Sequence, residues 1–456
     1  MIETNTLLAK YKQLFILFIP ILITQVAMYA MNFFDTTMSG HFSKQDLAGV
    51  AIGSSLWFPI STGFGTVLQA LTPITAQLMG AKKEKDISFI LIQGFYVAFS
   101  IAAIIIIVGA LLLKPILHMM QLDPYVEIVA KHYLWALAIG IIPLFIYNVC
   151  RSFIDALGMT KISMIITLLS LPLNILLNYL FIFGNFGFPR LGGAGAGFAT
   201  GITYWIIMMI AICVIHNMKP FSQLYIFRAF YRVSLVKWKE IFSLGVPMGL
   251  STFFEASIFS VVTLFMSKFG TNTIAAHQAA MNFESLLYML PLSISIAMTI
   301  TVGYEVGAKR YKDARAYSHI GIFIAILFAT VTGMLLFIYR NSVASIYSED
   351  PKVIALTSHF LLYAIFFQWS DAIQAPVQGA LRGYKDVHIT TIMTFISYWI
   401  IGLPLGFMLD AITALGPFAY WIGLISGLGV GAITLFSRLF HIQRKKAINR
   451  KKASLA

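Results

Sequence analysis

Three acidic residues stand inside long apolar stretches of this chain. Glu255 lies within an apolar run that continues to about Met266, and Asp35 and Asp371 fall inside two other runs. A carboxylate at the centre of a membrane helix costs about 2.5–3.5 kcal/mol on insertion scales, so it normally faces a bundle interior or a wet cavity. Acids held in this way are suited to taking up and releasing a cation or a proton.

Glu255 and Asp371 form the stronger pair, because no Lys or Arg falls at the centre of any predicted span. Two such acids bind a proton or hold a cation between them, so we expect both as ligands of a metal cation such as Na⁺. Glu284 and Tyr288 are four residues apart on one helix face and complete this cation-coupling site. The alternatives are a protonated structural pair for the first two and a purely structural role for Glu284.

A second candidate site lies in the first half of the chain. Asp35 is an acid without a basic neighbour in sequence, and Asn174 and Asn178 share one face of a later span. We expect these three to bind a cation or proton together, with Thr200 and Thr203 as weaker members. The alternatives are an interfacial role for the acid and interhelical hydrogen bonds for the amides, a common use of intramembrane polar groups.

The composition predicts a membrane protein that crosses the bilayer many times. The chain has 456 residues, of which 59% are hydrophobic and 11% charged, against about 25% charged in soluble domains. Mean hydropathy is +0.83. Because lipid cannot satisfy an open backbone, the spans must be helices and the fold all-α. Twelve apolar runs are long enough to cross a bilayer: 14–38, 47–71, 88–113, 129–152, 161–184, 194–216, 241–266, 274–300, 316–339, 354–380, 388–410 and 416–439.

The positions of the basic residues explain the net charge of +14 without a nucleic-acid partner. With both termini in the cytoplasm, most of the 32 Lys and Arg residues fall in cytoplasmic segments, as the positive-inside rule requires. The tail Arg444-Lys445-Lys446…Arg450-Lys451-Lys452 is typical of a topology signal, and its alternative role is contact with anionic lipid. We therefore expect a monomeric, multi-pass protein of the plasma membrane.

An internal repeat divides the chain. At a constant shift of 227 residues Pro20 meets Pro247, the segment Gly80-Ala81-Lys82-Lys83 meets Gly307-Ala308-Lys309-Arg310, and Asp123-Pro124 meets Asp350-Pro351. Each repeat holds six spans, an even number, so both halves face the same way. We predict two parallel six-helix lobes, 1–227 and 228–456, related by a pseudo-twofold axis along the membrane normal, with a substrate path near their interface.

Several classes of function are disfavoured by what the sequence lacks. It contains no Gly-x-x-x-x-Gly-Lys-Ser/Thr loop, so ATP does not drive transport through a P-loop. It also contains no clustered His or Asp of the kind that a membrane-embedded metalloenzyme needs. We expect a protein that is not an enzyme, has no resident cofactor, and uses a Na⁺ or H⁺ gradient. An ion channel remains an alternative that dye efflux against a gradient would separate.

Three segments carry a resemblance to a known family. Ile19-Pro20-Ile21-Leu22-Ile23-Thr24-Gln25 with Asp35, Gly245-Val246-Pro247 leading to Glu255, and Ala275-Ala276-His277-Gln278-Ala279-Ala280-Met281-Asn282 with Tyr288 resemble the multidrug and toxic compound extrusion transporters. The likeness covers essentially the whole chain. The set Glu255, Tyr288 and Asp371 is similar to the NorM branch, which exports cationic dyes and fluoroquinolones in exchange for Na⁺ or H⁺.

The resemblance implies roles for individual residues. It places the C-lobe cation site at Glu255, Tyr288 and Asp371, and the N-lobe polar site at Asp35, Asn174 and Asn178. Some branches carry an aspartate where this chain has Asn178, which removes one carboxylate from the N-lobe. Substrate contacts near the outer mouth are implied for three residues: Ser55, Gln278 and Asp350. The substrates implied are amphipathic organic cations and drugs; the alternative is a lipid-linked oligosaccharide flippase of the same superfamily, which should carry basic residues inside its spans.

Overall fold

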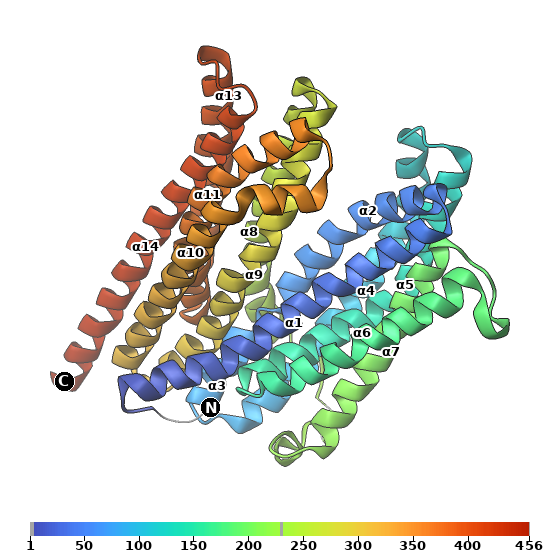
Figure 1. Cartoon of the computed structure of the whole chain (residues 1–456). Coiled ribbons are helices and arrows are strands. Elements are labelled where there is room, and N and C mark those ends of the chain that lie inside the picture. Colours follow the sequence, from blue (N-terminus) through green and yellow to red (C-terminus); the bar gives the residue numbers. More distant parts are fainter. Residues whose placement is uncertain (1–3, 229–230, 456) are drawn as a thin grey trace. The chain divides into compact units, whose positions relative to one another are not determined.

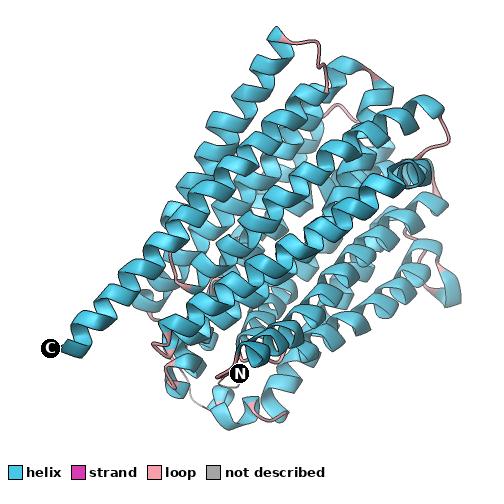
Figure 2. Ribbon diagram, turned by 60° about the vertical axis from the view of Figure 1, so that its left-hand side comes forward, coloured by secondary structure: helices cyan, strands magenta, loops and turns pink. Residues whose placement is uncertain are grey.

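The computed structural model describes residues 4–228 and 231–455, and within these ranges the chain is helical and contains no strand (Figure 2). Twelve segments of the described chain are long and apolar enough to span a membrane, which confirms the all-α fold. The α-helices are α1 Leu7–Phe42, α2 Lys44–Leu68, α3 Leu71–Gly80, α4 Glu84–Met119, α5 Pro124–Ala156, α6 Thr160–Phe183, α7 Gly193–Asn217, α8 Leu235–Met266, α9 Thr271–Gly307, α10 Tyr311–Tyr347, α11 Pro351–Gly383, α12 His388–Phe395, α13 Leu403–Ile412 and α14 Phe418–Leu455 (Figure 1).

Two of the predicted spans differ from simple helices. The second is completed by α3, after α2 ends at Leu68. The eleventh consists of α12, a π-helical stretch at Ile396–Gly402, and α13. A π-helical turn inserts an extra residue per turn and rotates the side chains that follow it, and such turns occur frequently at functional sites.

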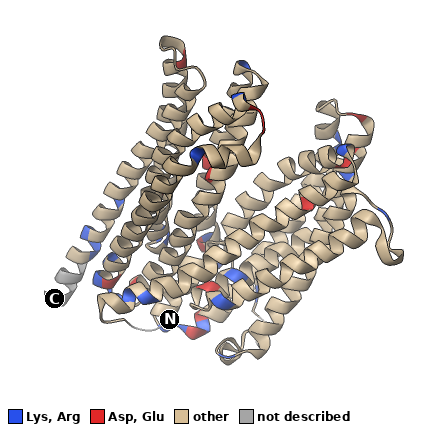
Figure 3. Cartoon of the chain, in the orientation of Figure 1, with Lys and Arg blue, Asp and Glu red and all other residues tan. Residues whose placement is uncertain are grey.

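Charged side chains are sparse along the helices. Figure 3 shows long stretches without Lys, Arg, Asp or Glu, with the charged positions mostly near helix ends. Two of these end positions are equivalent in the repeat. Asp123 caps α5 by accepting from Tyr125 N at 3.0 Å, and Asp350 caps α11 by accepting from Lys352 N at 2.8 Å. In both cases proline is the first helical residue, where its missing N–H is not needed.

The chain forms two compact units, each described here by itself. Unit 1 comprises the chain up to Leu22 together with everything from Leu250 onward, and unit 2 comprises Ile23–Gly249. Helices α1 and α8 therefore each contribute to both units. Their changes of unit, after Leu22 and after Gly249, lie at equivalent positions of the 227-residue repeat. This grouping reflects packing; the lobe boundaries predicted from the repeat, 1–227 and 228–456, stay a prediction.

The helices of each unit pack through small residues. A Cβ added to Gly379 on α11 would lie 2.2 Å from the carbonyl oxygen of Ser295 on α9, so the two backbones are nearly in contact. In unit 2 a Cβ on Gly195 of α7 would lie 2.5 Å from the carbonyl oxygen of Phe181 on α6. Small residues at helix interfaces are typical of membrane bundles, because close packing replaces the hydrophobic driving force that lipid removes.

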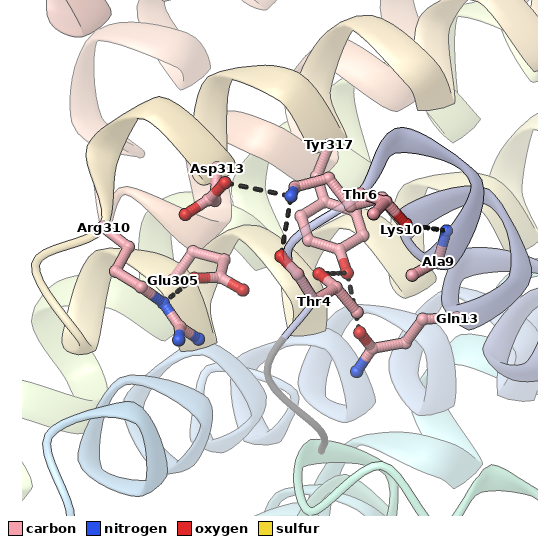
Figure 4. Close-up of polar contacts among 9 residues, drawn as sticks. All are labelled: Thr4, Thr6, Ala9, Lys10, Gln13, Glu305, Arg310, Asp313 and Tyr317. Atoms are coloured by element: carbon pink, nitrogen blue, oxygen red, sulfur yellow. Dashed lines mark hydrogen bonds and ion pairs between the residues drawn. The ribbon is translucent and has the colours of Figure 1, made fainter.

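The start of the chain is fastened to unit 1 by a polar network (Figure 4). Thr4 Oγ1 lies 2.9 Å from the hydroxyl of Tyr317 on α10, and that hydroxyl donates to Gln13 Oε1 over 2.7 Å. Lys10 Nζ donates to Thr4 O at 2.8 Å and pairs with Asp313 Oδ1 at 3.0 Å. Together with the apolar packing of the first turns of α1, this network explains why these residues belong to unit 1.

Candidate functional site

The polar residues predicted for the first half of the chain meet in unit 2. Asn178 Nδ2 donates to Asp35 Oδ1 over 2.6 Å, and Thr200 Oγ1 donates to Asp35 Oδ2 over 2.8 Å. Asn174 links the two donors: its Nδ2 lies 3.0 Å from Thr200 Oγ1, and its Oδ1 accepts from Asn178 at 3.1 Å. Helices α1, α6 and α7 each supply part of this network, so the predicted grouping is realised in three dimensions.

Each carboxylate oxygen of Asp35 accepts a hydrogen bond within a buried site. The side chain is 5% exposed, and donors on both oxygens stabilise an ionised carboxylate. The one amide oxygen of the cluster without a partner among the described residues is Asn178 Oδ1. Thr203, the weaker candidate on α7, bonds instead to Ala199 O of its own helix at 2.8 Å. It is therefore not part of the network.

Two tyrosines near Asp35 were not anticipated from the sequence. The side chains of Tyr133 on α5 and Tyr204 on α7 interact electrostatically with Asp35, and the Tyr133 hydroxyl lies 3.1 Å from Ser54 Oγ on α2. Tyr204 follows Thr200 by four residues, so helical spacing contained a usable signal. Tyr133 comes from another helix, and no spacing within its own span pointed to it.

Glu255 in unit 1 is held by a polar face of α11. Its Oε1 accepts from Gln378 Nε2 over 2.6 Å. Gln374, one turn earlier on the same face, donates to the hydroxyl of Tyr398 in the π-helical stretch over 2.9 Å. Asp371, Gln374 and Gln378 follow one another at helical spacing, so the sequence contained a signal for the two glutamines that the acids alone do not give.

Glu255 has a basic residue in its surroundings, although no Lys or Arg falls at the centre of a predicted span. Arg382, near the end of α11, interacts electrostatically with it. The reason is that α11 continues to Gly383, beyond the predicted end of its span at 380. Arg382 therefore occupies the next turn of the face that carries Gln378, and its side chain is partly buried rather than lying in a cytoplasmic loop.

The other three residues predicted for this half line one small cavity. Glu284 and Tyr288 reach it from α9, Asp371 from α11, and the remaining polar members are Thr332 on α10 and Gln368 on α11. Asp371 interacts electrostatically with Glu284 on one side and with Glu255 on the other. Electrostatic interactions therefore link Glu255, Asp371 and Glu284, and Tyr288 lines the same cavity. Both carboxyl oxygens of Glu284 are buried and have no hydrogen-bond partner among the described residues.

The residues expected at the substrate entrance lie elsewhere in the two units. Ser55 is exposed on α2 and donates to Ala51 O of its own helix at 2.8 Å. Gln278 is exposed on α9, and Asp350 is the exposed cap of α11. Exposure is compatible with substrate contact, which stays a prediction for all three. Within the described chain no group of three or more His, Cys, Asp or Glu side chains is arranged to hold a metal ion.

A family assignment rests on two matched segments. The family pattern MatE matches residues 20–180 and 247–408, so its two copies begin 227 residues apart, the same separation as the repeat. The chain belongs to the MatE family. Both copies begin at the equivalent prolines Pro20 and Pro247, and they cover every predicted cation-site residue except Thr200 and Thr203, which lie beyond the first copy.

Relatives of known name extend over nearly the whole chain. The chain is 56% identical over 443 residues to "Probable multidrug resistance protein NorM" of Bacillus anthracis, covering 97% of this chain and 98% of the relative. It is 53% identical over 443 residues to the protein of the same name in Bacillus subtilis strain 168, with the same coverage. The expected family and its NorM branch are therefore confirmed.

Solved structures share the fold at much lower identity. A structure described as the outward-facing conformation of a multidrug resistance MATE family transporter is similar with a TM-score of 0.87 and 18% identity, covering 98% of this chain and all of that one. The eukaryotic MATE transporter AtDTX14 is similar with a TM-score of 0.83 and 22% identity, over 98% of this chain and all of that one. These likenesses support the twelve-helix architecture.

Proposed function

We propose that this MatE protein is a secondary active antiporter that exports amphipathic, mostly cationic organic compounds in exchange for Na⁺ or H⁺. The observation that carries the proposal is the chain of acids in unit 1, where Asp371 lies electrostatically between Glu255 and Glu284 inside a membrane-spanning bundle. Buried acids are expensive in a bilayer and are retained where a cation pathway needs them. The names of the NorM relatives support drugs as the transported compounds.

The mechanism requires a competition between ion and drug for two states of the protein. An ion that binds these acids in the outward-open state favours release of drug to the outside, and release of the ion to the cytoplasm restores drug binding. Coupling of this kind needs only that ion and drug prefer different conformations. The coupling ion is transported cargo, and no resident cofactor is part of the proposal. We place the chain in the plasma membrane as a monomer, with both termini in the cytoplasm.

Two arginines bear on the flippase alternative. A lipid-linked pyrophosphate needs unmatched positive charge along the path. Arg382 interacts with Glu255. Arg151, in the last two turns of α5, has Nε 3.6 Å from Asp155 Oδ2 and donates to Gln25 Oε1 at 3.0 Å. Each arginine is thus matched by a carboxylate, and this arrangement favours the drug antiporter.

Transport in proteoliposomes tests the proposal. We expect ethidium to move when either an inward Na⁺ gradient or an inward proton gradient is imposed alone on vesicles containing the wild-type chain. Glu255→Gln should reduce this transport roughly 5- to 150-fold, the range of typical coupling free energies of about 1–3 kcal/mol. The fluorescence of the dye in the vesicles is the measurement.

The matched control is Glu349→Gln, because Glu349 is an exposed acid in the loop between α10 and α11. It should transport at the wild-type rate. Movement of dye without any imposed gradient, to equilibrium only, would indicate a channel, and wild-type efflux from Glu255→Gln would remove Glu255 from the mechanism.

A further inference from the structure

A cavity of about 310 Å³ opens in unit 1 between the start of α10 and the end of α14. Arg315 lines it from α10, and α14 supplies the rest of the wall: Phe440, Gln443, Arg444, Ala447 and Ile448. We call it the basic cavity. All of these residues lie just outside the predicted spans 316–339 and 416–439, at the depth of the lipid headgroups. Its volume falls in the range of small-ligand sites, about 300–1,000 Å³.

The wall of the basic cavity contains a buried donor without an acceptor. Gln443 is 6% exposed, and its Nε2 has no hydrogen-bond partner among the described residues. The hydroxyl of Tyr384, at the end of α11, lies near Gln443, but it too has no partner at hydrogen-bonding distance. Roughly 90% or more of buried polar groups in native proteins are satisfied, so this donor needs an explanation. A ligand oxygen in the cavity would supply the missing acceptor.

The positive charge of the basic cavity is unmatched. Its two charged lining residues are both arginines, and no acid lines it. Other basic residues of unit 1 pair with carboxylates: Lys10 with Asp313, Arg310 with Glu305, and Arg438 with Asp386. Neither Arg315 nor Arg444 forms such a pair within the described chain. The cavity therefore suits an anion.

The guanidinium group of Arg315 is held in place without using its terminal nitrogens. Its Nε donates to His319 Nε2 over 3.2 Å, and its Cζ lies 5.7 Å from the centre of the Phe440 ring. The two terminal nitrogens form no hydrogen bond with the described residues and can donate together to one ligand. Such a fork matches the oxygen spacing of a phosphate group.

We propose that the basic cavity binds the phosphate of an anionic phospholipid headgroup, held by Arg315 and Arg444, with Gln443 Nε2 donating to a phosphate oxygen. The exposed apolar side chains of Phe440 and Ile448 suit the acyl part of the lipid. Basic pockets between membrane helices on the cytoplasmic side bind anionic headgroups in this way. With both termini in the cytoplasm, as proposed above, the cavity faces the inner leaflet.

This inference goes beyond the antiporter proposal and does not depend on transport. It also differs from a general attraction of the basic tail to the membrane, because it names one site with a buried donor and an arginine from another helix. A merely electrostatic attraction would depend on the number of basic residues in the tail and not on which of them line the cavity.

Lipid-dependent stabilisation of the purified full-length chain tests the site. A ligand that binds only the folded state raises the melting temperature. In an uncharged detergent, added phosphatidylglycerol should raise the melting temperature, whereas phosphatidylcholine with the same acyl chains and inorganic phosphate should not. Native mass spectrometry should find one phosphatidylglycerol bound to each chain. Arg315→Gln should weaken the apparent affinity roughly tenfold or more, because a charge-assisted hydrogen bond is lost.

Two further comparisons separate the cavity from the tail and from a structural role. Arg444→Gln should reduce the phosphatidylglycerol shift, whereas Lys445→Gln, which removes the same charge from the exposed neighbour outside the cavity, should leave it nearly unchanged. Gln443→Leu removes a donor that has no partner, so it should keep the melting temperature measured without lipid and still reduce the shift. A structural role for Gln443 would give the opposite pattern. This variant also covers the case in which Arg315→Gln fails to fold.

The outcomes decide between a lipid site and its rivals. A phosphatidylglycerol shift of wild-type size in Arg315→Gln or in Gln443→Leu overturns the proposal. An equal shift with inorganic phosphate assigns the cavity to a soluble anion, and equal losses in Arg444→Gln and Lys445→Gln assign the effect to the charge of the tail, so each of these also overturns it. A chain that shows the lipid shift but moves no dye under any gradient rejects the proposed function and leaves the lipid site in place.

Discussion

The Asp35 cluster of unit 2 and the small cavity of unit 1 that Glu284 and Asp371 line differ in the hydrogen bonding of their buried carboxyl groups. Asp35 accepts one donor on each oxygen, from Asn178 and Thr200. Glu284 has no donor on either oxygen and faces a second acid across a small pocket. The carboxyl group of Asp35 is therefore satisfied by protein donors, whereas that of Glu284 is buried without a hydrogen bond among the described residues.

The largest expected effect concerns the packing that brings the pocket together. Gly379→Ala should lower the free energy of unfolding by about 3 kcal/mol, because the added methyl group would meet the backbone of Ser295 at 2.2 Å and force α9 and α11 apart. Thermal unfolding in detergent measures the loss. Gly429→Ala is the control, since a Cβ there has no neighbouring atom within 4 Å. Equal melting temperatures for the two variants would refute the close approach of α9 and α11.

The next prediction tests the contrast between the two sites directly. Asp35→Asn should destabilise the protein by about 1–3 kcal/mol, because the new amide group turns a donor toward Asn178 or Thr200 and leaves a buried polar group unpaired. Glu284→Gln should cost little or nothing, since no hydrogen bond within the described chain is lost. If both variants lose the same stability, the two carboxyl groups do not differ in the way described.

The smallest expected effect sharpens the account of the Asp35 cluster. Thr200→Val removes the hydroxyl that joins Asp35 to Asn174 and should cost about 0.6 kcal/mol and at most about 1.7 kcal/mol, the average and the maximum for interhelical hydrogen bonds in membranes. Thr203→Val, one turn away on α7, removes only a bond within its own helix and should cost less. Melting temperatures of the two variants in detergent, compared with wild type, measure the difference. A larger loss for Thr203→Val would contradict the network.

Local patterns in the sequence were sufficient for the architecture and for the identity of most candidate residues. Hydropathy predicts the twelve spans, because the cost of leaving polar groups in lipid depends on short stretches of chain. The 227-residue shift predicts the repeat that the family match also follows. The acids Asp35, Glu255 and Asp371 are visible as charges inside apolar runs. Helical spacing correctly grouped Asn174 with Asn178 and Glu284 with Tyr288.

Only the tertiary structure decided which buried acids accept hydrogen bonds and which residues donate them. Hydrogen-bond partners such as Gln378 for Glu255 and Thr200 for Asp35 come from other helices. Their pairing depends on how far each helix is rotated and how deep it lies. Hydropathy does not determine either, because apolar residues arranged in many different orders suit the bilayer equally well. Arg382 approaches Glu255 because α11 continues three residues past its predicted span. Thr332 lines the small cavity from α10, and nothing in the sequence of that helix indicates that it lies beside Glu284 and Asp371.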